Sequence, residues 1–208
     1  SLRMSGEQKY KEGDGPGQQA EATNAAEVMF FTDRCQVYKT RLSEFGDSKA
    51  SVLGDYLPAK LGMDEGESVV YMVLPGDYSG HLLFFFENGK IARVEMKAYA
   101  TVSNRRKLTG AYSDKSPLAA LLKLTEDKEL ALISTEPRAL LLHTALLAPK
   151  TTRATQGVAV MNLKKGQRIT DAHIYQEDEL QNPSRYRKKI PALGALPNGE
   201  EGGEQISL

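Results

Sequence analysis

Three consecutive cations, Arg105, Arg106 and Lys107, lie just ahead of Gly110 in the stretch "NRRKLTG". Guanidinium and ammonium groups bind phosphate, so this stretch could hold the backbone of a nucleic acid. The other interpretation is a solvated loop, which is the commoner role of a run of like charges. The surrounding sequence has to distinguish the two.

Two other stretches share the same design. "SKASVLG" carries Lys49 ahead of its glycine, and "TTRATQG" carries Arg153, with Lys150 directly before it. A glycine permits a positive φ, or close approach of another backbone, where each loop enters the next element. Because cation and glycine recur in register, we expect these loops to bring positive charge to one rim of a repeat architecture and to contact phosphates there.

Two further cations occupy equivalent places in the second strands of two predicted hairpins. Lys39 and Arg93 stand where a third hairpin has Leu141. We predict Lys39 and Arg93 as secondary phosphate contacts, and a solvated strand face is the alternative. A basic cluster lies near the C-terminal end and consists of Arg185, Arg187, Lys188 and Lys189. It either clamps DNA or balances the charge of the acidic residues around it.

The sequence offers little for other chemistry. His81, His143 and His173 are scattered, and no Cys, Asp or Glu accompanies them at metal-ligand spacing. The motifs GxGxxG, GxxxxGK[ST] and GxSxG are absent. We therefore predict no catalytic residue, no metal site and no cofactor in this stretch of chain, and an enzyme acting alone is the weakest hypothesis.

Composition sets the frame for these candidates. The 208 residues include 27 basic and 27 acidic side chains, so any attraction to nucleic acid must come from local segregation of charge. The lone Cys35 excludes an internal disulfide and suits a reducing cytoplasm. The longest apolar runs are too short to span a membrane. Because the chain begins with Ser1, we expect it to be a piece of a longer polypeptide.

The cations are placed by a repeat. Residues 28–45, 82–99 and 130–147 each read as an apolar run, a polar turn and a second apolar run, about 50 residues apart. Asn88-Gly89 favours a tight hairpin, and the flanks of that turn alternate as a strand with one buried face does.

Each unit continues beyond its hairpin. After each aligned glycine we predict another strand, within residues 55–63, 111–124 and 158–163, and residues 169–176 supply one more. Residues 117–124 suit a helix by composition, but their repeat partners favour a strand. Four strands in about 50 residues is the period of a propeller blade. We therefore expect an all-β wheel of three to four blades over residues 1–176.

The two ends complete this organisation. Residues 1–27 read as the end of a preceding blade, and residues 177–208 as an acidic, flexible tail. Such a tail could also compete with DNA for the rim.

The run "FFFENGKIARVEMKAYATVSNRRKLTGAYSDKSPL", with "FFTDRCQVYKTRLSEF" before it and "TTRATQGVAVMNL" after it, resembles the C-terminal domain of the DNA gyrase or topoisomerase IV A protein. The resemblance covers roughly residues 3 to 175. It implies a β-pinwheel whose basic rim binds and bends duplex DNA. Of the gyrase box Gln-Arg-Arg-Gly-Gly-Lys-Gly, this sequence keeps Arg105, Arg106 and Gly110, and gyrase and topoisomerase IV both stay open.

The resemblance also implies partners. The whole enzyme, a type II topoisomerase, would be a tetramer of two A and two B subunits, in the cytoplasm and associated with the nucleoid. The B subunit would use ATP and Mg²⁺, and the catalytic tyrosine would lie elsewhere in the A protein. The domain would guide a DNA segment for strand passage, giving negative supercoiling or decatenation. The alternative is a β-propeller module that binds proteins and has no DNA role.

Overall fold

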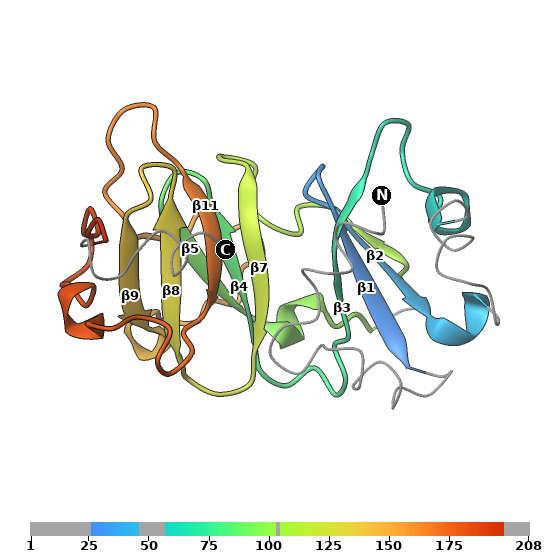
Figure 1. The fold of residues 1–208 in the computed structure, drawn as a ribbon. Coiled ribbons are helices and arrows are strands. Elements are labelled where there is room, and N and C mark those ends of the chain that lie inside the picture. Colours follow the sequence, from blue (N-terminus) through green and yellow to red (C-terminus); the bar gives the residue numbers. More distant parts are fainter. Residues whose placement is uncertain (1–25, 46–56, 103–104, 198–208) are drawn as a thin grey trace. The chain divides into compact units, whose positions relative to one another are not determined.

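The computed structural model describes residues 26–45, 57–102 and 105–197 (Figure 1). Contacts divide the chain into two compact units. The first unit takes the chain up to Gly80, with Glu95–Asp114 and Thr151–Ala154, and the second takes His81–Val94, Lys115–Lys150 and the chain from Thr155 onward. Within the described residues, no helix is both long enough and apolar enough to cross a membrane.

The predicted repeat is confirmed by three hairpins, each followed by a short 3-10 helix. Their central turns hold residues with positive φ at two of the predicted turn centres, 56° at Cys35 and 91° at Gly89. The hairpins and helices are β1 (Glu27–Thr32), β2 (Val37–Arg41) and η1 (Leu42–Phe45); β4 (His81–Phe86), β5 (Lys90–Glu95) and η2 (Met96–Tyr99); and β8 (Glu129–Ser134), β9 (Ala139–His143) and η3 (Thr144–Leu146).

The three hairpins lie in three separate sheets, so the all-β fold class is confirmed. The first sheet has the order β3-β1-β2-β6, the second β10-β5-β4-β7 and the third β11-β8-β9. The outer strands β6 and β10 each lie beyond the next hairpin in sequence, so neighbouring repeats exchange a strand. The added strands are β3 (Val69–Val73), β6 (Lys107–Leu108), β7 (Leu118–Leu124), β10 (Val158–Ala159) and β11 (Ile169–Ile174). The strands predicted within 117–124 and 169–176 are thus confirmed as β7 and β11.

The first strands of the three hairpins, β1, β4 and β8, carry unbroken apolar runs because both of their faces are buried. In the first unit, Phe30 and Tyr38 pack with Leu57 and Leu74 on one face of the sheet. In the second unit, apolar side chains of the second and third sheets share one core. Each fully buried Leu or Phe stabilises the fold by about 1.5–3 kcal/mol.

The strand predicted within residues 55–63 is wrong. Residues 57–61 form a helical turn instead. Pro58 suits the first turn of a helix, where its missing N–H has no partner to lose. Gly62 has a φ of 67° and ends the turn, and the Met63 amide donates to the Pro58 carbonyl oxygen at 2.9 Å. Local proline and glycine geometry therefore overrides the apolar pattern.

The expectation of a flexible tail is wrong for residues 177–197. This segment contains η4 (Pro183–Arg185), buries Tyr186 completely and leaves Leu180 only 5% exposed. An apolar side chain buried on the third sheet anchors a segment whose composition reads as disordered. Residues 198–208, and nearly all of the preceding-blade segment 1–27, lie outside the described residues.

Candidate functional site

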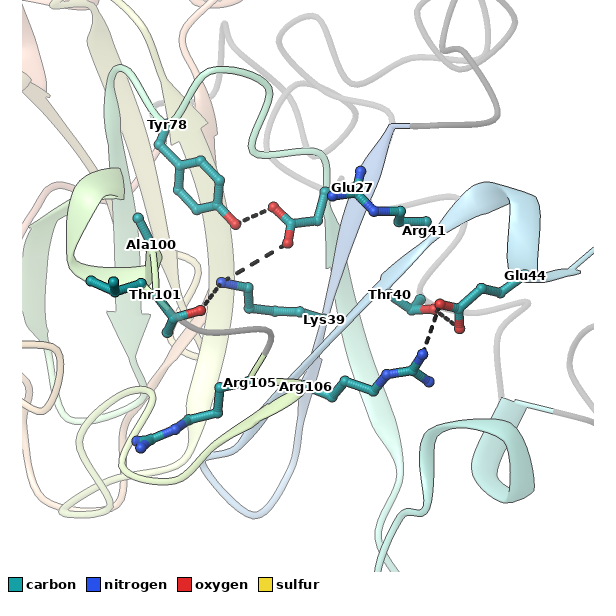
Figure 2. A pocket seen from close by; sticks show the side chains of 11 residues that line it. Glu27, Lys39, Thr40, Arg41, Glu44, Tyr78, Ala100, Thr101, Arg105 and Arg106 are labelled. Atoms are coloured by element: carbon teal, nitrogen blue, oxygen red, sulfur yellow. Dashed lines mark hydrogen bonds and ion pairs between the residues drawn. The ribbon is translucent and has the colours of Figure 1, made fainter.

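A hollow of about 530 Å³ lies in the first unit, beside the loop that bears the arginine pair (Figure 2). Its floor is β2, which contributes Lys39, Thr40 and Arg41 from successive positions. Four cations and two carboxylates line it, so its charge is net positive. The lining residues are Glu27, Lys39, Thr40, Arg41, Glu44, Tyr78, Ala100, Thr101, Val102, Arg105 and Arg106.

Lys39 is buried in the hollow and hydrogen-bonds the residues around it. Its side chain is 5% exposed, and its Nζ donates to the Tyr99 carbonyl oxygen at 2.8 Å and to Thr101 Oγ1 at 3.1 Å. Glu27 Oε2 lies 4.0 Å from the same nitrogen. Burial lowers the pKa of Lys39, the Glu27 charge opposes that change and the nearby Arg153 charge adds to it. Lys39, which the sequence predicts as a phosphate contact, therefore already uses its ammonium group to hydrogen-bond Tyr99 and Thr101 in the wall of the hollow.

Arg105 and Arg106 flank the hollow from the chain that leads into β6. Figure 2 shows their side chains pointing in opposite directions, with Arg106 turned toward Glu44. The Arg106 Nη2 atom lies 3.0 Å from Glu44 Oε1, and this arginine side chain is 67% exposed. Arg105 is exposed and, among the described residues, has no hydrogen-bond or ion-pair partner. Exposed pairs contribute about 0–1 kcal/mol, so a phosphate can compete for both guanidinium groups at small cost.

Lys107 differs from the two arginines because it is part of β6. Its backbone pairs with Tyr38 in β2, and its Nζ lies 3.5 Å from Asp64 Oδ2 and 5.6 Å from the centre of the Tyr38 ring. The strand exchange thus holds the predicted cationic loop against the first sheet. The Lys39 amide donates to the Arg106 carbonyl oxygen at 2.6 Å, which places the arginines beside the hollow.

The third predicted loop is divided between the two units. Arg153 belongs to the first unit, where its Nη1 donates to the Ala98 carbonyl oxygen at 2.9 Å. Its Nε is buried and has no hydrogen-bond partner among the described residues. Lys150 belongs to the second unit, where it is exposed and its amide donates to the Arg93 carbonyl oxygen at 2.8 Å. Lys49 lies outside the described residues.

Arg93 is a correction to the prediction. It is 8% exposed, because all four central residues of β5 are buried and not only one face of the strand. Its Nε donates to His81 Nδ1 at 3.0 Å, and its Nη1 lies within 2.8–3.2 Å of Asp127 Oδ1 and the carbonyl oxygens of Thr144 and Leu147. Because these acceptors already occupy its Nε and Nη1 donors, Arg93 holds the end of the third hairpin and is not placed to contact DNA.

Sequence reasoning missed Arg41, which lines the hollow with Lys39. The two residues are two positions apart in β2, so they project from the same face of the strand. That period-two spacing was the available signal. It also missed Glu27 and Tyr78, which face Lys39, and the Tyr78 hydroxyl donates to Glu27 Oε1. The described residues contain no group of three His, Cys, Asp or Glu side chains that could hold a metal ion.

Comparison with known proteins confirms the resemblance seen in the sequence. The family described as "DNA gyrase C-terminal domain, beta-propeller" matches residues 26–74 and 148–175. The chloroplastic/mitochondrial DNA gyrase A protein of Arabidopsis thaliana is 26% identical over 71% of this chain, and the DNA gyrase A protein of Mycoplasma pneumoniae is 22% identical over 67%. The chain spans only 16% and 17% of those two proteins.

Solved structures show the same fold. The C-terminal domain of DNA topoisomerase IV matches with a TM-score of 0.62 and 21% identity, covering 76% of this chain and 49% of that domain. The E. coli ParC C-terminal domain matches with a TM-score of 0.64 and 13% identity, covering 86% of this chain and 79% of that domain. The DNA gyrase A C-terminal domain matches with a TM-score of 0.59 and 18% identity, covering 87% of this chain and 64% of that domain. The β-pinwheel prediction is thereby confirmed.

Proposed function

We propose that this chain binds and bends duplex DNA as the C-terminal domain of the A protein of a type II topoisomerase. The observation that carries the proposal is the hollow of the first unit, where four cations surround a concave surface and Arg105 stands exposed beside it. Phosphates are the dominant attractors for such cations. The similarity to gyrase A domains supports the same assignment.

The geometry supports a particular set of contacts. Arg105, Arg106 and Arg41 bind phosphates directly, and Lys107 and Arg153 add positive charge near them. Lys39 holds the wall of the hollow through its hydrogen bonds to Tyr99 and Thr101, and its charge makes the electrostatic potential in the hollow more positive. Glu27 and Glu44 keep the unbound cations in place, and Glu44 releases Arg106 when a phosphate arrives. Lys49 and Lys150 stay proposed contacts from the aligned loops.

The test is salt-dependent binding of a fluorescently labelled duplex, followed by anisotropy. For the unaltered chain we expect a dissociation constant of about 1 μM or weaker and a log–log salt slope of about −3 to −5. Arg105→Ala should reduce the magnitude of the slope by about 1. Lys165→Ala removes one exposed positive charge from a turn of the second unit and should leave the slope unchanged. Equal slopes for both variants would exclude Arg105 as a contact.

The role of the whole protein is part of the same proposal. The domain guides a DNA segment toward the rest of the A protein, in an A2B2 tetramer whose B subunit uses ATP and Mg²⁺. The parent enzyme then introduces negative supercoils or decatenates. A relaxed-plasmid assay of the parent enzyme distinguishes the two activities, because only gyrase activity produces negative supercoils.

The second candidate is a protein-binding module without a DNA role. The balance of 27 basic and 27 acidic residues favours it, since such a chain has no global attraction to DNA. Flat anisotropy at low salt, together with recovery of a defined protein partner, would select this candidate.

A further inference from the structure

The third sheet has no outer strand from a following hairpin among the described residues, and residues 183–197 cover its edge instead. We call this stretch the closing segment. Ala139 in β9 and Ala195 exchange both backbone hydrogen bonds, each of 2.9 Å. The Leu141 amide donates to the Tyr186 carbonyl oxygen at 2.9 Å, and Leu141 also forms a parallel bridge with Arg187.

The closing segment occupies the place that β10 occupies in the second sheet. Val158 of β10 pairs with Ile91, two residues after the turn centre Gly89, and Ala195 pairs with Ala139, two residues after Pro137. A glycine with positive φ precedes each paired residue: Gly157 at 80° and Gly194 at 86°.

The two glycines are also packed alike. A Cβ on Gly157 would lie 2.2 Å from the Ile91 carbonyl oxygen, and a Cβ on Gly194 would lie 2.9 Å from that of Ala139. Both positions therefore require glycine for conformation and for close backbone approach.

Side chains fasten the closing segment to the outer face of the third sheet. Tyr186 is fully buried and packs with Ala131 and Leu141. The Arg187 guanidinium donates to both oxygens of Glu129, at 2.7 and 2.9 Å. A planar guanidinium paired in this way has a defined geometry as well as a favourable charge interaction.

We infer that the edge of β9 is a strand-docking site and that the closing segment is its ligand, bound in cis in place of an exchanged strand. The site accepts a short peptide in which glycine precedes the residue that pairs with Ala139, with a tyrosine upstream to fill the apolar face. An uncovered edge strand presents unpaired amides to other chains, so the docked segment also protects against edge-to-edge association.

The first test is hydrogen exchange on the full chain with a matched pair of glycine variants. Gly166 has a φ of 81° and open space around its Cβ position, so Gly166→Val imposes backbone strain without a clash. Gly194→Val adds the clash with Ala139. We expect exchange at the Ala139 and Leu141 amides to accelerate at least about tenfold more in Gly194→Val. Equal effects of the two variants would overturn the inference.

The second test supplies the segment in trans. A synthetic peptide of residues 183–197 is added to the Gly194→Val chain, and a peptide that itself carries Gly194→Val serves as control. We expect only the unaltered peptide to restore protection at Ala139 and Leu141. Loss of protection throughout β8 and β11 would mean that the variant unfolds, and the same rescue is then measured on Arg187→Ala. No rescue of a folded variant would refute the docking site.

Discussion

Replacing Arg93 with lysine separates a structural role from a DNA-binding one. Lysine keeps the positive charge that a phosphate contact would need. It cannot keep the contacts of the guanidinium, which reaches His81 through Nε and three oxygen atoms through Nη1. An ammonium group on a flexible stem presents its three donors from a single point. We therefore expect Arg93→Lys to lower stability while leaving DNA binding unchanged.

The magnitude follows from the acceptor that loses its donor. Leu147 is 2% exposed, so water cannot replace the arginine at its carbonyl oxygen, whereas the Thr144 carbonyl oxygen keeps the Leu147 amide as a donor at 2.9 Å. A buried acceptor left without a partner costs about 1–3 kcal/mol, so Arg93→Lys should lower the free energy of unfolding by that amount. For a chain of this length, that change lowers Tm by about 2–12 °C.

The assay pairs thermal unfolding with duplex-binding anisotropy on the same samples. Arg105→Lys and Arg105→Ala are the matched controls, because Arg105 is exposed and lines the hollow. We expect the Arg105 variants to keep the parental Tm and Arg105→Ala to lose DNA affinity. A parental Tm for Arg93→Lys, or weakened DNA binding below its Tm, would refute the structural assignment of Arg93.

Two further predictions concern buried titrating groups. Burial lowers the pKa of His173, but hydrogen bonds to Asp171 and Glu179 outweigh it and raise the pKa above 6.5. Because the pKa is raised, the stability that protonated His173 contributes is complete below about pH 6.5 and is lost as pH rises through the folded value. Chemical denaturation of His173→Gln should therefore show a flatter pH profile above about pH 6.5. Glu67 is 6% exposed and accepts the Tyr38 hydroxyl at 2.6 Å, so Glu67→Gln turns an acceptor into a donor and should cost about 2 kcal/mol. A pH profile unchanged by the first substitution, or an unchanged midpoint for the second, would contradict these assignments.

Local patterns in the chain determined the hairpins. Apolar runs on both sides of a turn, recurring about every 50 residues, specify β1 and β2 and their two counterparts, because burial of apolar side chains is encoded residue by residue. The same register identified β7 as a strand against its helical composition. It also directed attention to Arg105 and Arg106, which the fold does place beside the hollow.

Only the tertiary structure decided which cationic side chains are exposed and able to meet a phosphate. The sequence predicts both Arg93 and Arg105 as phosphate contacts, but Arg93 meets acceptors from residues 34, 51 and 54 positions away. The exchanged edges, including the closing segment, depend on backbone hydrogen bonds that most side chains permit. Because a backbone amide carries no sequence signature, its partner becomes known only when distant parts of the chain are brought together.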